Sequence, residues 1–271
     1  MKAVTWTQVA QYIVLIVAYL IPAIIMSAKK FGLPIPQLTY GSAISQISEL
    51  EQTFIKSGLA PATMKQHVAP FTSYSPANYF WLILCLMIGT ASLPHVLMRY
   101  FTTPSVRDAR KSVAWSLLFI FLLYFTAPAY AAFSKLEVYT TLIGKPLAEI
   151  PLWVFSWGKL GLVSICGKAA SSLEAVQAAC GAIQGQGGIV RFQDFSINPD
   201  VVVLSTPEIA GMPYVIAGLV AAGGLAAALS TADGLLLALA NALSHDIYYK
   251  MINPNAPTAR RLVISRPSTA A

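Results

Sequence analysis

Four stretches of the chain are apolar over about 20 consecutive positions, the length that an α-helix needs to cross the hydrocarbon core of a membrane. They lie at about residues 9–27, 79–98, 112–133 and 212–242. A fifth apolar stretch, residues 147–166, is interrupted by charged residues and a proline, and its two tryptophans are typical of a helix lying in the membrane interface. The pattern therefore predicts an all-α integral membrane protein with four transmembrane helices.

The composition supports the membrane class. Of the 271 residues, 56% are hydrophobic and only 11% are charged, and the mean hydropathy is +0.63. Soluble domains carry roughly 25% charged residues, so the composition excludes an ordinary soluble enzyme and a disordered chain. The first apolar run exceeds the roughly 7–15 residues of a signal-peptide core, and no A-x-A cleavage motif follows it. We therefore expect it to remain as a span.

The net charge of +7 predicts an orientation rather than nucleic-acid binding, because no basic patch with stacking aromatics accompanies it. With four spans, the N-terminus, the short loop 99–111 and the tail 250–271 share one side, and the long loops 28–78 and 134–211 share the other. Lys and Arg crowd the short loop and tail, whereas acidic residues balance them in the long loops. Cytoplasmic loops carry this excess, so we expect cytoplasmic termini and helical outer loops, although Lys29 and Lys30 argue weakly against it.

The three cysteines form neither a CxxC pair nor a metal-ligand set with histidine. Cys85 lies in an apolar run and is expected to pack there. Cys166 and Cys180 share the second outer loop, where a disulfide would form if that side is oxidising. The sequence predicts no cofactor and no resident metal.

The fourth span has one small, polar face and one bulky face when it is read as a helix. Ala227, Ser230 and Thr231 fall within an arc of about 120°, together with Gly223, Gly224, Gly234, Ala238 and Asn241. Five leucines lie opposite, at positions 225, 229, 236, 239 and 243. The hydroxyls could simply bond to carbonyls of the preceding turn. Alternatively, two hydroxyls and the carbonyl of Ala227 form an uncharged oxygen site suited to a monovalent cation.

Asp233 is the one acidic residue within a predicted span. An ionisable side chain at membrane depth is costly and is a functional candidate, so Asp233 is a candidate for ion coupling. The alternative is a structural carboxylate bonded to a neighbouring helix. His245 and Asp246 lie at the cytoplasmic end of the helix and are expected to anchor it. His245 is too far along the helix from Ser230 for a serine hydrolase, and a second aspartate for an intramembrane protease is missing, so an enzyme is not expected.

The second span combines small and polar residues with a proline at membrane depth. Pro94 removes a backbone hydrogen bond, and broken helices mark binding sites in transporters. Gly89, Thr90, Ser92 and His95 are therefore candidates for contact with a small organic anion. A plain proline kink is the alternative.

The fourth span also carries a family resemblance, in the stretch GGLAAALSTADGLLLALANALSHDIYYK. It resembles the eighth core helix of the sodium:solute symporter family, in particular the branch that transports acetate and other monocarboxylates. Two further segments are similar to the fifth and sixth core helices: KAVTWTQVAQYIVLIVAYLIPAI and GTASLPHVLMRYFT. The resemblance covers nearly all of the chain outside the long loops.

The resemblance implies part of an inverted-repeat fold of five plus five helices, of which this chain matches core helices five to eight. It implies sodium-coupled symport of a small organic solute such as acetate across the plasma membrane, the inner membrane of a bacterium, with sodium as a co-transported ligand rather than a cofactor. The sodium ligands map onto Ala227, Ser230 and Thr231. The expected partners are the lipid bilayer, sodium, an organic anion and transporter helices supplied by a neighbouring polypeptide. The alternative is an inactive remnant or a non-transporting subunit of a split symporter.

Overall fold

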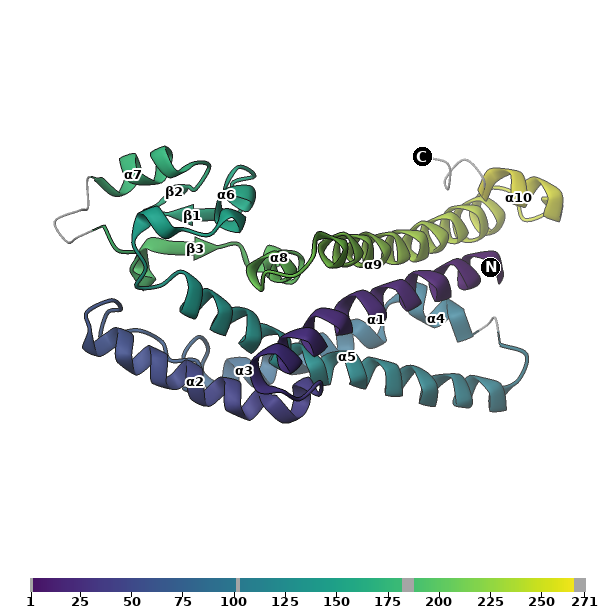
Figure 1. The fold of residues 1–271 in the computed structure, drawn as a ribbon. Coiled ribbons are helices and arrows are strands. Elements are labelled where there is room, and N and C mark those ends of the chain that lie inside the picture. The colour runs from purple at the N-terminus through teal and green to yellow at the C-terminus, as the bar shows by residue number, and fades with distance from the viewer. Residues whose placement is uncertain (1, 101–102, 182–187, 266–271) are drawn as a thin grey trace. The chain divides into compact units, whose positions relative to one another are not determined.

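A computed structural model describes residues 2–100, 103–181 and 188–265. Parts of the predicted loop 99–111 and tail 250–271 therefore lie outside the described residues. The chain divides into two compact units: unit 1 comprises residues 1–15, 73–119 and 223–271, and unit 2 comprises residues 16–72 and 120–222. The long helices α1, α5 and α9 each contribute to both units (Figure 1).

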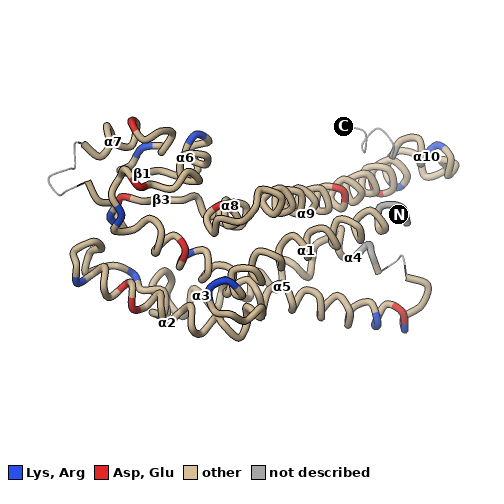
Figure 2. Tube along the Cα trace, in the orientation of Figure 1, with Lys and Arg blue, Asp and Glu red and all other residues tan. Residues whose placement is uncertain are grey.

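Three helices of the described chain are long and apolar enough to cross a membrane. They are α1 (Lys2–Phe31), α5 (Val106–Thr141) and α9 (Tyr214–Asn241), the last continuing as a π-helix, η4 (Ala242–Ile252). The first, third and fourth predicted spans fall within these helices, except for the first residues of the fourth. Charged residues lie mainly toward the helix ends and in the outer segments (Figure 2), as an apolar environment along the helices requires.

The second predicted span is broken into two helices, as Pro94 suggested, and neither is long enough to cross a membrane, so the expected count of four transmembrane helices is not confirmed. It consists of α3 (Pro76–Ala91) and the short α4 (Pro94–Tyr100). Pro94 has no N–H to donate to the carbonyl of Thr90, which instead accepts from the N–H of Leu93 at 3.4 Å. The proline thus ends α3 and starts α4.

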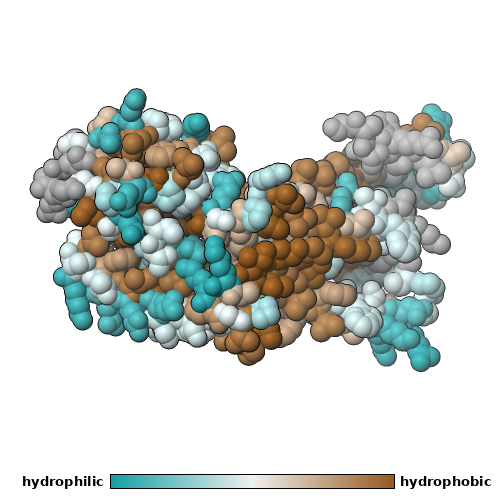
Figure 3. All heavy atoms as spheres, viewed as in Figure 1, coloured by the Kyte–Doolittle hydropathy of each residue, from teal (hydrophilic) through white to brown (hydrophobic). Residues whose placement is uncertain are grey.

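Much of the apolar surface remains uncovered by the described chain. None of the α3 residues is buried, and large side chains such as Trp81 and Met87 on α3 and Phe121 and Tyr124 on α5 are exposed. A broad apolar area is visible on the face shown in Figure 3. Such an area is typical of a surface that meets lipid or other membrane helices.

The largest hydrophobic core lies in unit 2. It is formed by the second half of α1, by α2 (Pro36–Lys56), by the second half of α5 and by the segment that follows α5. Met26, Ile47, Phe133 and Leu136 are almost completely buried there. The amphipathic helix α2 buries one face in this core, so the predicted loop 28–78 contains a long helix.

The second outer loop contains a small sheet, so the expectation of an all-α fold is wrong there. The antiparallel order is β2-β1-β3, with β1 at Val163–Ile165, β2 at Lys168–Ala169 and β3 at Phe195–Ile197. In β1 the two apolar residues are buried on either side of a half-exposed serine, and β3 repeats the apolar–serine–apolar pattern. Such alternation suits a strand with one buried face.

The predicted interfacial helix at residues 147–166 also differs from the structure. The stretch forms η1 (Leu147–Glu149), α6 (Leu152–Gly158) and β1. Trp153 is buried against Phe195, and the Nε1 of Trp157 donates to Glu208 at 2.9 Å. Both tryptophans therefore make contacts within unit 2. The remaining described elements are α7 (Leu173–Gly181), η2 (Phe192–Asp194), η3 (Pro199–Val201), α8 (Val202–Ile209) and α10 (Thr258–Ser265).

Cys166 and Cys180 form a disulfide, called here the loop disulfide. It joins the turn after β1 to α7. Cys85 is a free thiol on α3 and is exposed in the described chain, so it does not pack in the core of this chain.

Candidate ion site

All the candidate site residues lie in unit 1, on α9, at the end of α3, in the break that follows it and on α4. On α9, Gly234 is buried and Ser230 and Asp233 are half-buried, whereas Thr231 is exposed. The covered face is therefore centred near Ser230 and Gly234, and Thr231 lies at its edge, because each residue turns the helix by about 100°. The five leucines that oppose this face are exposed.

The hydroxyl of Thr231 bonds within its own helix. Its Oγ1 donates to the carbonyl oxygen of Ala227 at 3.2 Å, so two of the three predicted sodium ligands are adjacent. This is also the local bond that a threonine makes in a membrane helix without any ion. The contact alone therefore fits both a cation site and a simple bond within the helix.

The backbone of Ser230 is held by α1. Gln8, which is only 8% exposed, donates its Nε2 to the carbonyl oxygen of Ser230 at 3.0 Å. In an α-helix a carbonyl ordinarily accepts from the backbone N–H four residues later, so Gln8 is a second donor to the Ser230 carbonyl. The bond ties α1 to α9 at the level of the predicted sodium site.

Asp233 is held by the same helix. Gln11 donates its Nε2 to Asp233 Oδ2 at 3.4 Å, a long hydrogen bond. Gln8, Gln11 and Tyr12 are spaced i, i+3 and i+4 and therefore share one face of α1. The spacing of these three residues is the sequence signal of this polar face.

His95 on α4 also lies against α9. A Cβ placed on Gly234 would lie 3.4 Å from His95 Cδ2 and 3.6 Å from Gln8 Nε2, so the glycine lets both side chains approach the α9 backbone closely. His95 Nδ1, Gln11 Oε1 and Tyr12 OH are buried and lack a hydrogen-bond partner among the described residues. Buried polar atoms are normally satisfied; of these three residues, Gln11 and His95 lie beside α9, whereas the Tyr12 ring lies against Phe119 of α5.

We call Gln8, Gln11, His95, Ser230 and Asp233 the inner polar cluster. It brings His95, Ser230 and Asp233 together from sequence positions far apart. The other candidates of the second span are not in it: Gly89, Thr90 and Ser92 are exposed. Thr90 Oγ1 donates to the carbonyl of Leu86 at 2.7 Å and Ser92 Oγ to that of Gly89 at 3.0 Å, so both hydroxyls bond within their own segment.

His245 and Asp246 lie on η4, beyond the cluster, and are exposed. His245 Nδ1 and Asp246 Oδ1 are 3.1 Å apart, and Lys250 bonds the same carboxylate at 3.3 Å. The group lies at the end of the helix and bonds locally, as expected for an anchor.

Comparisons with known proteins agree on a transporter family. Residues 1–142 match the sequence model of the sodium:solute symporter family. An uncharacterized symporter of Cupriavidus necator is 36% identical over 358 aligned positions, which cover 98% of this chain and 50% of the relative. A monocarboxylic acid transporter of Corynebacterium glutamicum is 49% identical over 47 residues, covering 17% of this chain and 8% of that protein. The chain thus spans about half the length of the Cupriavidus necator relative. No solved structure matches.

Proposed function

Because this chain belongs to the sodium:solute symporter family, a family of membrane transporters, we propose that it forms part of a sodium-coupled symporter for a small monocarboxylate such as acetate. Sodium is the co-transported ion of the family. The solute class is supported by the matched segment of the Corynebacterium glutamicum monocarboxylic acid transporter. The single observation that carries the ion site is the bond from the buried Gln8 to the carbonyl of Ser230 at 3.0 Å, which holds this part of α9 against a neighbouring helix.

We propose that Ala227, Ser230 and Thr231 provide one wall of the sodium site. Carbonyl and hydroxyl oxygens suit a hard monovalent cation that must bind and then leave, because they carry no full negative charge. Thr231 is exposed in the described chain, so other segments of a complete transporter can reach the ion from that side. The bond from Gln8 to the Ser230 carbonyl would hold the wall in place.

Asp233 and His95 lie beside this wall and are proposed to take part in ion coupling and solute contact, respectively. Asp233 is three residues beyond Ser230, and its carboxylate would attract the cation electrostatically. His95 faces the buried cluster, with Nδ1 available for a hydrogen bond from or to a solute. Gly89, Thr90 and Ser92 lie at the break of the second span, where exposed hydroxyls could meet the anion.

We also propose that both termini face the cytoplasm of a bacterial cell and that residues 28–78 and 134–211 lie outside it. The distribution of Lys and Arg supports this orientation. The loop disulfide supports it independently, because disulfides persist in oxidising compartments.

The test is uptake of labelled acetate into proteoliposomes with and without a sodium gradient. The chain is assayed alone and together with the other half of the Cupriavidus necator relative, supplied as a second polypeptide. Ser230→Ala/Thr231→Ala should reduce sodium-dependent uptake at least tenfold, whereas Ser244→Ala, farther along the same continuous helix, should leave it unchanged. Uptake that ignores both sodium and the double substitution would overturn the ion-site proposal.

A second candidate follows from the coverage of the Cupriavidus necator relative, half of which has no counterpart in this chain. In this alternative, the chain is a subunit that is inactive unless a neighbouring polypeptide supplies the other helices. Activity with the second polypeptide and none without it would favour the subunit. Uptake by the chain alone would exclude it.

A further inference from the structure

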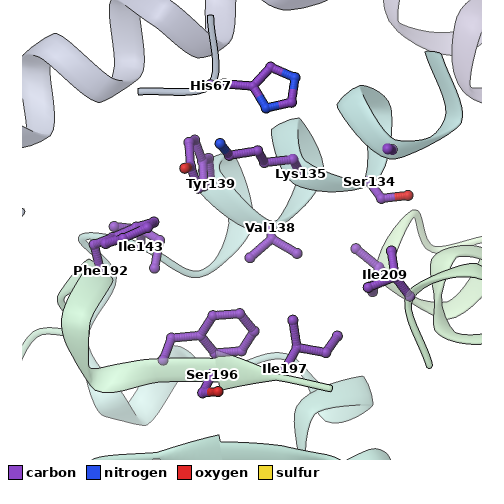
Figure 4. Close-up of a pocket in the computed structure, with 13 residues that line it drawn as sticks. His67, Ser134, Lys135, Val138, Tyr139, Ile143, Phe192, Ser196, Ile197 and Ile209 are labelled. Atoms are coloured by element: carbon purple, nitrogen blue, oxygen red, sulfur yellow. The ribbon is translucent and has the colours of Figure 1, made fainter. Parts of the chain in front are cut away.

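Unit 2 contains a pocket that is separate from the candidate ion site. It lies between α5, β3 and α8 and has a volume of about 480 Å³ (Figure 4). Small-molecule sites in proteins typically measure about 300–1,000 Å³ and are mainly apolar. We call this cavity the outer pocket; its size alone admits a small ligand.

The walls of the outer pocket are mostly apolar. Val138 from α5, Ile197 from β3 and Ile209 from α8 line it, and Figure 4 shows Val138 pointing from the helix toward the strand. Val138 and Ile209 are otherwise almost fully buried, so the cavity continues the hydrophobic core. An apolar ligand would gain free energy by covering these side chains.

Polar groups gather on one side of the pocket, but their charges are already balanced. Lys135 Nζ lies 2.9 Å from Glu51 Oε1, and this carboxylate is completely buried. The same carboxylate accepts hydrogen bonds from the Tyr139 hydroxyl at 3.2 Å and the His67 backbone N–H at 2.9 Å. A ligand carboxylate at Lys135 would have to share one ammonium with Glu51, and like charges at one site repel. The charge balance therefore disfavours an anion.

His67 does not supply a compensating positive charge. Partial burial, with Lys135 as the next cause, lowers the pKa of its imidazole below the ordinary 6.5, against the opposing effect of Glu51. The imidazole is therefore mostly neutral at pH 7 and can exchange a hydrogen bond with a neutral ligand. The apolar lining and the charge balance therefore both favour an uncharged ligand.

We propose that the outer pocket binds an uncharged, mainly apolar small molecule of aromatic or branched aliphatic type. This solute class differs from the proposed transported anion, and the binding requires neither sodium nor transport. The bound molecule would contact α5, β3 and α8 together.

The experiment measures binding of 5-fluoroindole to the purified full chain in lipid nanodiscs by ligand-observed ¹⁹F relaxation, with empty nanodiscs subtracted. Val202 lines the pocket, whereas its neighbour Val203 is not among the lining residues and is 39% exposed. Val202→Trp should weaken binding at least tenfold by filling the pocket, and Val203→Trp should bind like the unchanged protein. Ile197→Trp, at a position whose side chain points from β3 toward Val138 (Figure 4), serves as a second blocking variant, and thermal melting checks that each variant is folded.

The anion 4-fluorobenzoate, of similar size, tests the charge argument and should bind at least tenfold more weakly than 5-fluoroindole. Saturable 5-fluoroindole binding that a folded blocking variant abolishes supports the proposal. No saturable binding above empty nanodiscs, equal binding by the folded blocking variants, or equal binding of the anion would each overturn it. None of these outcomes depends on acetate uptake, so this proposal and the proposed function can fail separately.

Discussion

Replacing Glu51 by glutamine should strongly destabilise unit 2. The Glu51 side chain has no exposed surface and lies 2.9 Å from the ammonium of Lys135. It also accepts from the hydroxyl of Tyr139 and the backbone N–H of His67. A glutamine retains one acceptor oxygen but directs an NH₂ donor at one of these three donors, so at least one of them loses its partner.

The expected loss in the free energy of unfolding follows from the burial of Glu51 and Lys135. Removing one member of a buried ion pair costs about 3–5 kcal/mol. The Lys135 side chain is 27% exposed, so water can replace part of the lost interaction, and we expect a loss near the lower limit, about 3 kcal/mol. If the cost comes from the unpaired ammonium, adding Lys135→Met should restore part of the stability. The coupling energy of the double-mutant cycle should be about 1.5–3 kcal/mol.

The free energy of unfolding is measured by denaturant titration in mixed micelles, with tertiary structure followed by near-UV circular dichroism. Glu49→Gln is the matched control, because Glu49 is on the same helix and exposed, and it should change stability by less than about 0.5 kcal/mol. If Glu51→Gln cost no more than Glu49→Gln, the buried carboxylate would contribute nothing to the fold and this reasoning would be refuted.

Three further predictions concern the same unit. Gly158→Ala should lower the free energy of unfolding by about 2–3 kcal/mol, because the new Cβ would lie 1.9 Å from the carbonyl oxygen of Ala170. Gly41→Ala, with open space around the added Cβ, should instead stabilise α2 by about 0.5–1 kcal/mol. Melting temperatures of the two variants equal to that of the unchanged protein would contradict both predictions. The pKa of His67 is lowered in the folded chain, so its contribution to stability is complete above its ordinary pKa of about 6.5 and is lost as the pH falls. His67→Gln should therefore flatten the pH dependence of the unfolding midpoint below about pH 6.5. An unchanged profile would show that another group titrates. Reducing the loop disulfide, whose cysteines are 14 positions apart, should lower the free energy of unfolding by about 3 kcal/mol. The free energy is measured by denaturant titration with and without a reductant. An effect below about 1 kcal/mol would mean that the disulfide adds little to the stability of the fold.

The membrane class could be predicted because hydropathy is a local property. A long run of apolar residues is stable only away from water, and in lipid a helix can satisfy all its backbone hydrogen bonds within one segment. The effect of Pro94 was also readable, because a missing N–H ends a helix whatever its neighbours are. The leucine face of α9 followed in the same way from the helical repeat.

The inner polar cluster was only half predictable. Asp233 is identifiable from the sequence because a carboxylate stands out in an apolar run, whereas Gln8 and Gln11, near the start of the first span, are uncharged and stand out less. Their importance depends on α9, since the bond from Gln8 to Ser230 joins residues 222 positions apart. No periodicity in either helix reports which face meets the other.

By itself, the sequence determined that this is a helical membrane chain, where its long helices lie and which transporter family it resembles, because apolar length, helix breakers and local motifs are properties of short segments. Only the tertiary structure decided that Glu51 is a buried ion-pair partner, that the second outer loop forms a sheet, and that α5, β3 and α8 leave a pocket between them. These features arise from packing between segments far apart in the chain, where burial and charge depend on neighbours that no local pattern specifies.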